Sequence, residues 1–576
     1  MRYIIQKIWN LLTAKERVGM SCLIIALIIS GGFELLGIGL VMPIIALLSK
    51  PELVEQNKQL KLVYDFFQPS SQSQFVLILC FTVIGIYIFK NLFMLKLTQA
   101  ISSFVMNKSA SFASTLFFNY VNAPYEYHLK YSSSELHKKL DIISTAYSTI
   151  FQALLVVISD TVIICCILLM LLYFSPLTTL ILATIFLVIN FGVYMPFKDY
   201  NYSLGQKFLN YNQEITKYDL QALRGIKEVI VGDFQDKLSS SYNDLQQKRG
   251  RTNSKRYVVG QVPRFFIETL VVVMGLGTLA TFVLCGLAHG SIILQLGLLA
   301  VSMIRIMPSM SRIQYNITLI RQFLHPFNTI YQDLVKLKPV KVETSENPPL
   351  EFKDCLEIKD MTFAYNENDN VLFDKFNLSI PHAASVAFVG TTGCGKTTLI
   401  DIILGLLKPQ TGKITVDGRD IEENLSSWRK LIGYVPQFIF LRNSSIAENV
   451  ALGYKDKDID MEKVKACLKI AQLDKFVDTL PKKTETLVGE NGVRLSGGQR
   501  QRIGIARALY HDPEILVLDE ATSALDSETE NAFVDALNCL KGKLTIIMIA
   551  HRLTTVENCD KVIKLEAQKL KNGEEK

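Results

Sequence analysis

The sequence predicts a membrane-embedded all-α domain of six helices followed by an α/β domain. Six apolar stretches, each about 20 residues or longer, precede Arg312 and are long enough to cross a bilayer. After Leu350, short apolar runs alternate with helical patterns, which is typical of a buried sheet. We therefore expect a transmembrane domain at 1–338, a linker at 339–349 and a second domain at 350–576.

The composition supports this division. A chain of 576 residues exceeds what one hydrophobic core usually serves. Its net charge of +7 is explained more simply by basic cytoplasmic loops than by a nucleic-acid surface, so we expect no nucleic-acid partner. The ten cysteines show no paired spacing, which argues against a disulfide framework or a metal site.

The apolar stretches define the expected spans. They lie near Met20–Leu48, Gln74–Ile101, Thr149–Leu172, Pro176–Pro196, Phe265–Gly286 and Ser291–Met310. The polar loops at 106–147 and 198–263 are long, and the second is rich in Lys and Arg. By the positive-inside rule we place these loops, the N-terminus and the second domain in the cytoplasm.

Two amphipathic helices are expected beside the spans. The segment Met1–Arg17 carries apolar residues at helical spacing among basic ones, which favours a helix in the membrane interface. The segment Pro51–Pro69 has Leu60, Val63 and Phe67 on one face and predicts an external helix.

The second domain has six expected strands. They are Leu356–Phe363, Ser385–Val389, Ile414–Val416, Ile432–Val435, Ile515–Leu518 and Thr545–Ile549. Because most of these runs are continuously apolar, we expect a buried, largely parallel sheet.

A phosphate-binding loop follows the strand at 385–389. The pattern GxxxxGK[ST] directly after a strand and before a helix is the context of a P-loop, in which backbone N–H groups surround phosphates. Lys396 would contact the β- and γ-phosphates, and the Thr397 hydroxyl would bind Mg²⁺. We expect ATP and Mg²⁺ on the following residues: Gly390, Thr391, Thr392, Gly393, Cys394, Gly395, Lys396, Thr397 and Thr398.

Two carboxylates end the strand Ile515–Leu518. An acid at this position can hold Mg²⁺, and the next one can orient an attacking water. We assign Asp519 to the metal and Glu520 to catalysis.

The run Leu495-Ser496-Gly497-Gly498-Gln499 precedes a helix and forms a second phosphate-contacting surface. Together with the P-loop and Asp519-Glu520, it resembles the ABC ATPases, and the resemblance extends from about Leu350 to the end of the domain. The resemblance implies that this turn of one subunit closes over ATP bound to the other. Because every motif is intact, we expect a homodimer.

The same resemblance implies further roles. Tyr365 would stack on adenine. Gln437 would sense Mg²⁺ and serve catalysis, Asp526 lies in the D-loop, and His551 would be the switch histidine near the γ-phosphate. The expected catalytic residues are thus Glu520, His551 and Gln437, and the expected metal ligands are Thr397, Gln437 and Asp519.

Six spans before such a domain resemble the ABC exporter arrangement. Two short loop segments, Pro124–Lys130 and Gln221–Ile230, correspond to the coupling helices that dock on the ATPase in that family.

Three basic residues lie in or beside the spans, where charges usually have a function. They are Lys90, Arg264 and Arg305, and the acidic residues Glu34, Asp160 and Glu268 are their possible partners. Whether Arg264 pairs with Glu268 is open, whereas we expect Lys90 and Arg305 to line a cavity, and Lys90, Arg264 and Arg305 are the expected substrate-binding residues. In a cavity these groups would attract a phosphate or pyrophosphate.

The external helix, the loop Pro124–Leu136 and the stretch Gly393–Lys396 resemble the PglK-type lipid-linked oligosaccharide flippases. This resemblance implies ATP-driven flipping of a polyprenyl-pyrophosphate glycan across the bacterial inner membrane for protein glycosylation. The alternative is an exporter of lipid A, a drug or a peptide. An ABC ATPase that acts as a gate without transport is a third possibility.

Overall fold

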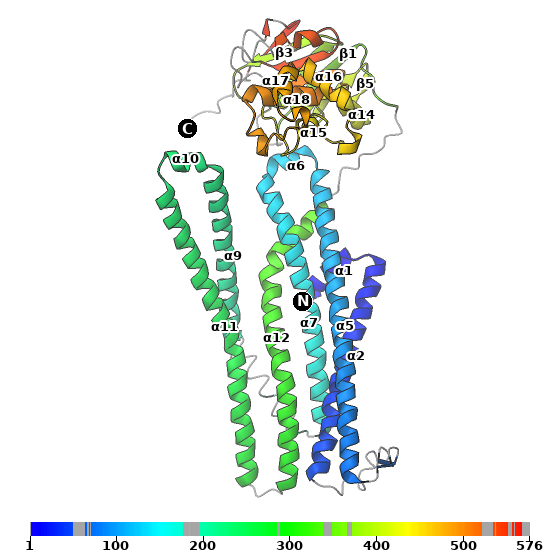
Figure 1. Ribbon diagram of the computed structural model, residues 1–576, viewed down its shortest axis with the longest axis vertical. Helices are drawn as coiled ribbons and strands as arrows, with labels where there is room; N and C mark the ends of the chain where they lie inside the picture. Colours follow the sequence, from blue (N-terminus) through cyan, green and yellow to red (C-terminus); the bar gives the residue numbers. More distant parts are fainter. Residues whose placement is uncertain are drawn as a thin grey trace. The chain divides into compact units, whose positions relative to one another are not determined.

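The computed structural model describes residues 2–49, 64–65, 68–69, 71–174, 176, 184, 195–284, 289–337, 348–365, 371–520, 534–535, 537–550, 556–557 and 559–566. The chain divides into two compact units, which are both visible in Figure 1. The helical unit comprises Met1–Asn122 and Ser132–Pro339, and the α/β unit comprises Ala123–Tyr131 and Val340–Lys576. The short segment Ala123–Tyr131 therefore clusters with the α/β unit although it is far from it in sequence.

Long helices build the helical unit. They are α1 (Arg2–Leu11), α2 (Ala14–Ser49), α5 (Gln72–Val121), α7 (Ser133–Phe174), α9 (Met195–Arg224), α10 (Ile226–Val231), α11 (Gln235–Leu284) and α12 (His289–Lys336). Helix α12 packs along α7, α5 packs on α2 and α7, and α9 pairs with α11, as Figure 1 shows. Helix α1 buries Ile4 and Ile8 and leaves Trp9 partly exposed.

Three helices among the described residues are long and apolar enough to cross a membrane, within α2, α5 and α7. Five of the six expected spans coincide with parts of α2, α5, α7, α11 and α12. The fourth, Pro176–Pro196, and most of the external helix expected at Pro51–Pro69 lie outside the described residues. Helix α5 has 50 residues. At about 1.5 Å per residue it is about 75 Å long, so it extends well beyond a hydrocarbon core of about 30 Å.

The α/β unit contains two sheets. Its strands are β1 (Cys355–Phe363), β2 (Phe373–Pro381), β3 (Ser385–Gly390), β4 (Thr411–Val416), β5 (Arg419–Asp420), β6 (Ile432–Val435), β7 (Ile515–Leu518), β8 (Thr545–Ile549) and β9 (Lys561–Leu565). Strands β6-β7-β8-β3-β9 form a parallel sheet, and β2-β1-β4-β5 form an antiparallel one. The expectation of a largely parallel sheet was therefore wrong for β1 and β4, which pair in antiparallel register.

Two apolar cores lie in the α/β unit. The helices are α6 (Tyr125–Lys130), α13 (Lys396–Ile403), α14 (Leu425–Lys430), α15 (Ile446–Val450), α16 (Met461–Ile470), α17 (Asp474–Thr479) and α18 (Gly497–Leu509). One core packs α13 against the sheets and includes Trp428, whose indole N–H donates to the Ile403 carbonyl at 2.8 Å. The other packs α15, α16 and α18 together. The two cores support different parts of the site.

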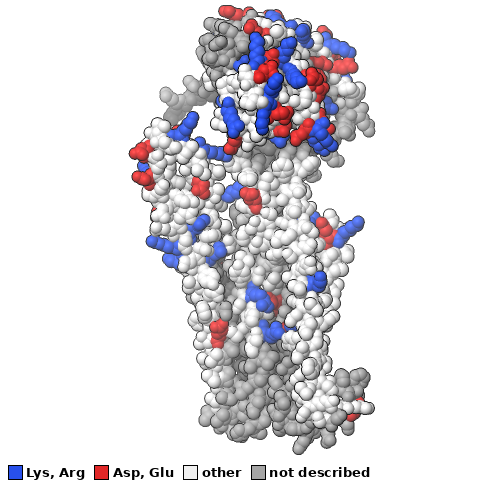
Figure 2. Space-filling view, viewed as in Figure 1, with Lys and Arg blue, Asp and Glu red and all other residues white. Residues whose placement is uncertain are grey.

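Charged side chains are distributed unevenly. In Figure 2, Lys, Arg, Asp and Glu crowd the α/β unit, whereas the long helices present mostly uncharged surfaces. The few charges buried among those helices are therefore notable, because burying a charge without a partner is costly.

Candidate functional site

The P-loop connects β3 to α13 and requires glycine at defined positions. Gly395 caps α13 with φ +95°, and Gly393 has φ +83°, a region that residues with a side chain rarely adopt. A Cβ on Gly390 would lie 2.4 Å from the Leu565 carbonyl oxygen. A side chain at position 390 would therefore collide with the neighbouring strand β9. The first N–H groups of α13 have no partner within the helix, so they can bind a ligand.

Lys396 lies inside this loop. Its side chain is buried, and its ammonium donates to the carbonyl oxygens of Gly390 at 2.9 Å and Thr391 at 3.0 Å. The Cys394 sulfur lies 3.9 Å from the same ammonium. A positive charge is thus held beside the free N–H groups of a helix N-terminus, and this donor set fits the phosphates of a nucleotide.

The buried strand β7 brings two carboxylates to the same edge of the sheet. Asp519 is 5% exposed, and burial raises its pKa, with a further increase from Glu520 that the Lys396 ammonium opposes. A divalent cation bound beside Asp519 would favour the ionised carboxylate and so oppose this rise in its pKa. The buried carboxylate of Asp519 therefore fits Mg²⁺, which would neutralise phosphate charge when bound, and Thr397 and Gln437 stay predicted as its further ligands.

Glu520 and Gln437 are in direct contact. The Gln437 Nε2 donates to Glu520 Oε2 at 2.6 Å. Glu520 has φ +47°, an uncommon backbone conformation for a residue with a side chain. The structure thus joins the loop after β6 to the acidic end of β7, and the catalytic roles of Gln437 and Glu520 stay predictions.

Tyr365 contacts the P-loop helix α13. Its hydroxyl and that of Thr398 are 2.9 Å apart, and either can donate the hydrogen bond. The ring stacks edge-on against Phe363 and is 53% exposed. Stacking of this exposed ring on adenine stays a prediction.

The signature turn is built on the other core. Ser496 caps α18: its Oγ accepts from the Gln499 N–H at 3.2 Å, and the Gln499 side chain accepts from the Ser496 N–H at 2.9 Å. This reciprocal capping box fixes the turn without help from the P-loop. Gly497 opens the helix and Gly498 is buried in its first turn. The signature turn is thus built separately from the P-loop, and its contact with phosphate stays a prediction.

Two expected site residues lie outside the described residues, namely Asp526 and His551. Their roles remain predictions. The side chain of Arg264 is outside the description as well, so its expected pairing with Glu268 stays open.

Sequence reasoning assigned no role to two residues near the site. Asp401 on α13 is 7% exposed, and burial followed by the charge of Asp519 raises its pKa to about 6. Tyr125 on α6 packs against the same core, and burial followed by Asp401 raises its pKa. The sequence did contain a signal for Asp401, because it is a single carboxylate within the apolar run that follows Lys396. Tyr125 lies in the segment Pro124–Lys130, which was expected to dock on the ATPase, and this segment clusters with the α/β unit.

The helical unit holds a cluster of charges inside its expected spans. The Lys90 ammonium pairs with Glu34, and Arg305 Nη1 lies 2.8 Å from Glu34 Oε1. Lys90 is only 5% exposed, whereas the Arg305 side chain is 38% exposed. The expectation that both residues line a cavity is therefore revised for Lys90, which is enclosed with its partner.

A second pair involves Arg312, which lies further along α12 than Arg305. Arg312 donates through Nε and Nη2 to the two oxygens of Asp160, at 2.9 Å and 2.6 Å, and Nη2 also lies 3.0 Å from Ser309 Oγ. Three basic and two acidic groups meet in this part of the helical unit (Lys90, Arg305, Arg312, Glu34 and Asp160), so these side chains carry a net charge of 3 − 2 = +1. We call them the span charge cluster.

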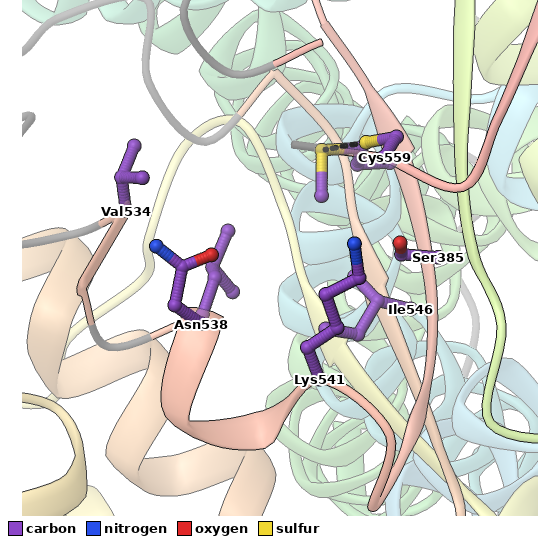
Figure 3. Close-up of a pocket in the computed structure, with 8 residues that line it drawn as sticks. Ser385, Val534, Asn538, Lys541, Ile546 and Cys559 are labelled. Atoms are coloured by element: carbon purple, nitrogen blue, oxygen red, sulfur yellow. Dashed lines mark hydrogen bonds between the residues drawn. The ribbon is translucent and has the colours of Figure 1, made fainter. Parts of the chain in front are cut away.

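A small pocket of the α/β unit lies away from the P-loop. Figure 3 shows Ser385, Lys541, Asn538 and Cys559 around it, and the Cys559 sulfur lies 3.8 Å from that of Met548. Ser385 begins β3, whereas the P-loop follows the end of this strand. The pocket is therefore distinct from the nucleotide site.

Asp560 contacts two residues that line this pocket, Ser385 and Lys541. Its Oδ2 accepts from the Ser385 N–H and hydroxyl, both at 2.8 Å, and its Oδ1 lies 2.9 Å from the Lys541 ammonium. The hydrogen bond from Lys541, followed by those from Ser385, lowers the pKa of Asp560 to about 2, from an ordinary value of 3.8.

Asp560→Ala is expected to lower the free energy of unfolding by about 1–2 kcal/mol, because charge-assisted bonds to a half-exposed group are partly screened by solvent. This contribution is fully present above pH 3.8 and is lost as the pH falls through about 2. Urea unfolding of the full chain in detergent, followed by tryptophan fluorescence, measures it. Glu557→Ala, on an exposed residue, is the control, and equal midpoints for the two variants would contradict the assignment.

Comparisons with known proteins agree with this geometry. Residues 373–523 match the family model described as ABC transporter. The chain is 44% identical over 213 residues to an ATP-dependent lipid A-core flippase of Ralstonia nicotianae, covering 37% of the chain and 36% of the relative. It is 32% identical over 402 residues to the protein of that name from Pectobacterium atrosepticum, covering 68% of the chain and 67% of the relative. The chain thus spans little more than a third of the length of the Ralstonia relative it matches.

Among solved structures, a bacterial Atm1-family ABC exporter with ATP bound matches with a TM-score of 0.73 and 21% identity, covering 96% of the chain and 94% of that protein. This likeness shows an exporter-type fold. These relatives do not carry the name of the PglK-type flippases, so the finer resemblance is not supported. The P-loop geometry, the family match and the coverage of the Pectobacterium relative together show that the chain belongs to the ABC transporter family and ends in an ABC-type ATPase domain.

Proposed function

We propose that two copies of this chain form an ATP-driven exporter that flips a phosphate-bearing lipid outward across the bacterial inner membrane. The relatives named lipid A-core flippase favour a lipid of that type as the substrate over the lipid-linked oligosaccharide expected first. The observation that carries the substrate class is the span charge cluster, which is net positive and has Arg305 partly open.

Arg305 is the residue we propose for phosphate binding. Glu34 accepts from both Arg305 and the Lys90 ammonium, so one carboxylate serves two cations. A phosphate can replace Glu34 at Arg305 while Lys90 keeps its ion pair. The planar guanidinium suits a phosphate because it can donate two parallel hydrogen bonds.

ATP hydrolysis is the proposed energy source. Lys396 and the N-terminus of α13 would hold the phosphates, Thr397, Asp519 and Gln437 would hold Mg²⁺, and Glu520 would orient the attacking water. The signature turn of the second copy would cover the nucleotide, because Ser496 and Lys396 stand on different cores of one unit.

Exposed apolar residues support pairing of two copies. Helix α10 buries none of its residues, and Ile230 and Val231 are 57% and 87% exposed. In the α/β unit, Phe438 is 84% exposed directly after Gln437. Surfaces of this kind usually mark contacts with another protein.

Arg305→Ala is expected to raise the lipid concentration for half-maximal ATPase stimulation about ten-fold or more, because a charge-assisted hydrogen bond is lost. The test measures ATPase activity and lipid flipping in proteoliposomes with a lipid A-core lipid, a polyprenyl-pyrophosphate glycan and neutral phosphatidylcholine. Basal ATPase activity should stay near the parent value.

Arg251→Ala, on an exposed residue of α11, is the matched control. Flipping of the pyrophosphate glycan alone would return the substrate to the lipid-linked oligosaccharide class. Unchanged flipping by Arg305→Ala would remove Arg305 from the substrate site, and absence of flipping with every lipid would overturn transport of phosphate-bearing lipids.

A further inference from the structure

Three arginines of the signature helix α18 bind backbone carbonyl groups in separate loops. Arg500 donates to the Leu495 carbonyl at 3.2 Å, and Arg502 donates to the Gln472 carbonyl at 2.8 Å. Arg507, near the other end of the helix, makes a set of contacts with the chain that follows Gln437. Its contacts join two parts of the site that the signature motif alone does not connect.

The Arg507 guanidinium makes three hydrogen bonds. Its Nε donates to the Asn449 carbonyl at 2.8 Å, Nη1 donates to the Phe440 carbonyl at 2.9 Å, and Nη2 donates to Asn449 Oδ1 at 3.2 Å. The fork geometry of arginine allows these bonds at once, which a lysine cannot reproduce.

Asn449 extends this connection along the loop. Its side chain is completely buried; Oδ1 accepts from the Arg442 N–H at 2.9 Å, and Nδ2 donates to the carbonyls of Arg442 and Ser445, each at 3.0 Å. The segment Phe438–Ser445, which we call the phenylalanine loop, is therefore fastened to α18 through Arg507 and Asn449.

The loop has an exposed outer side and a catalytic neighbour. Phe438 and Phe440 are 84% and 62% exposed, although the Phe440 carbonyl is held by Arg507. Gln437, directly before the loop, donates to Glu520. A shift of this loop would therefore move Gln437, which contacts Glu520, and would also displace α18 through Arg507. Helix α18 begins directly after Ser496.

Arg507 is partly buried, and this burial lowers the pKa of its guanidinium. Within the described part of the chain, the acceptors of its hydrogen bonds are uncharged carbonyl and amide oxygens. An apolar residue here would avoid that desolvation cost but would leave the Phe440 and Asn449 carbonyl oxygens without this donor, so the guanidinium is what fastens the loop to the helix.

We propose that Arg507 is a positioning residue that couples the phenylalanine loop to the signature helix, so that substrate occupancy alters how Ser496 is presented to nucleotide. The proposal rests on the proposed function, because a signal from the transport pathway must reach the ATPase. Arg507 itself contacts neither nucleotide nor lipid in this role.

The test compares Arg507→Met and Arg507→Lys with Arg502→Met in the full chain in proteoliposomes. Arg502 occupies the same helix and donates to the Gln472 carbonyl and, at 3.4 Å, to the Gly498 carbonyl of its own helix, both outside the phenylalanine loop, so its variant controls for helix stability. For Arg507→Met we expect basal turnover and the KM for ATP to stay near the parent values. Stimulation by the lipid A-core lipid should fall about five-fold or more, the scale of an ordinary coupling energy. Arg507→Lys, which keeps one donor, should restore part of it.

Hydrogen–deuterium exchange provides a readout that needs no lipid. With the non-hydrolysable analogue AMP-PNP and Mg²⁺, parent protein should protect amides of the phenylalanine loop and of α18 together. In Arg507→Met only α18 should gain protection. Joint protection in that variant, or an equal fall of basal and stimulated turnover, would overturn the proposal. If Arg507→Met does not fold, parent-like loop protection and stimulation in Arg507→Lys would overturn it. Parent protein that no lipid stimulates would contradict the proposed function instead, and the exchange result would still decide the role of Arg507.

Discussion

Glu520→Gln is expected to slow ATP hydrolysis by about 10²- to 10⁴-fold, the usual contribution of a positioned general base. Glu520 follows the buried Asp519 at the end of β7, and its carboxylate accepts from the Gln437 amide at 2.6 Å. Glutamine has nearly the same shape and can still contact Gln437. It cannot accept a proton from water, so the substitution removes proton transfer and leaves the phosphate-binding groups in place.

ATP binding should persist in this variant, and bound ATP should accumulate in closed dimers. Phosphate release measures turnover, while native mass spectrometry of the detergent-solubilised protein counts bound nucleotides. Glu514→Gln is the matched control, since Glu514 stands directly before β7, at the opposite end of the same strand. Turnover of Glu520→Gln at the parent rate would show that another group activates the water.

Local patterns explain which strands could be predicted. The runs Ile432–Val435, Ile515–Leu518 and Thr545–Ile549 were predicted with the bounds that the structure has, because a buried parallel strand is apolar on both faces. Strand β2 was missed because exposed polar residues alternate with its buried ones. Its antiparallel pairing with β1 is a tertiary property that neither segment encodes alone.

The same distinction separates the parts of the site. The P-loop and the signature turn were predictable because each is contiguous and brings its own helix N-terminus. Arg507 was not, because its carbonyl partners lie about sixty residues away in the sequence. Charges in the spans could be located from hydropathy, but their pairing depends on how the helices rotate against one another. The structure was therefore needed to show that Lys90 and Arg305 both form ion pairs with Glu34.

Glu34→Gln is expected to destabilise the helical unit by about 3–5 kcal/mol, the usual cost of removing one partner of a buried ion pair. Lys90 is 5% exposed and would keep its charge without a carboxylate beside it. The loss should be measurable as earlier thermal unfolding in nanodiscs. Glu135→Gln is the control, because Glu135 is 48% exposed and its partner Lys139 keeps Asp333 at 3.1 Å, so it should cost far less.

Adding Lys90→Met to Glu34→Gln should recover most of that stability, because the double variant removes the unpaired cation and fills its space with an apolar chain. Arg305 would then lack its carboxylate but retain its partly open position. The double variant should consequently bind phosphate-bearing lipid at least as tightly as the parent, since Glu34 no longer competes with phosphate for the guanidinium. A double variant as unstable as Glu34→Gln alone would mean that the carboxylate stabilises the helices through Arg305 rather than through Lys90.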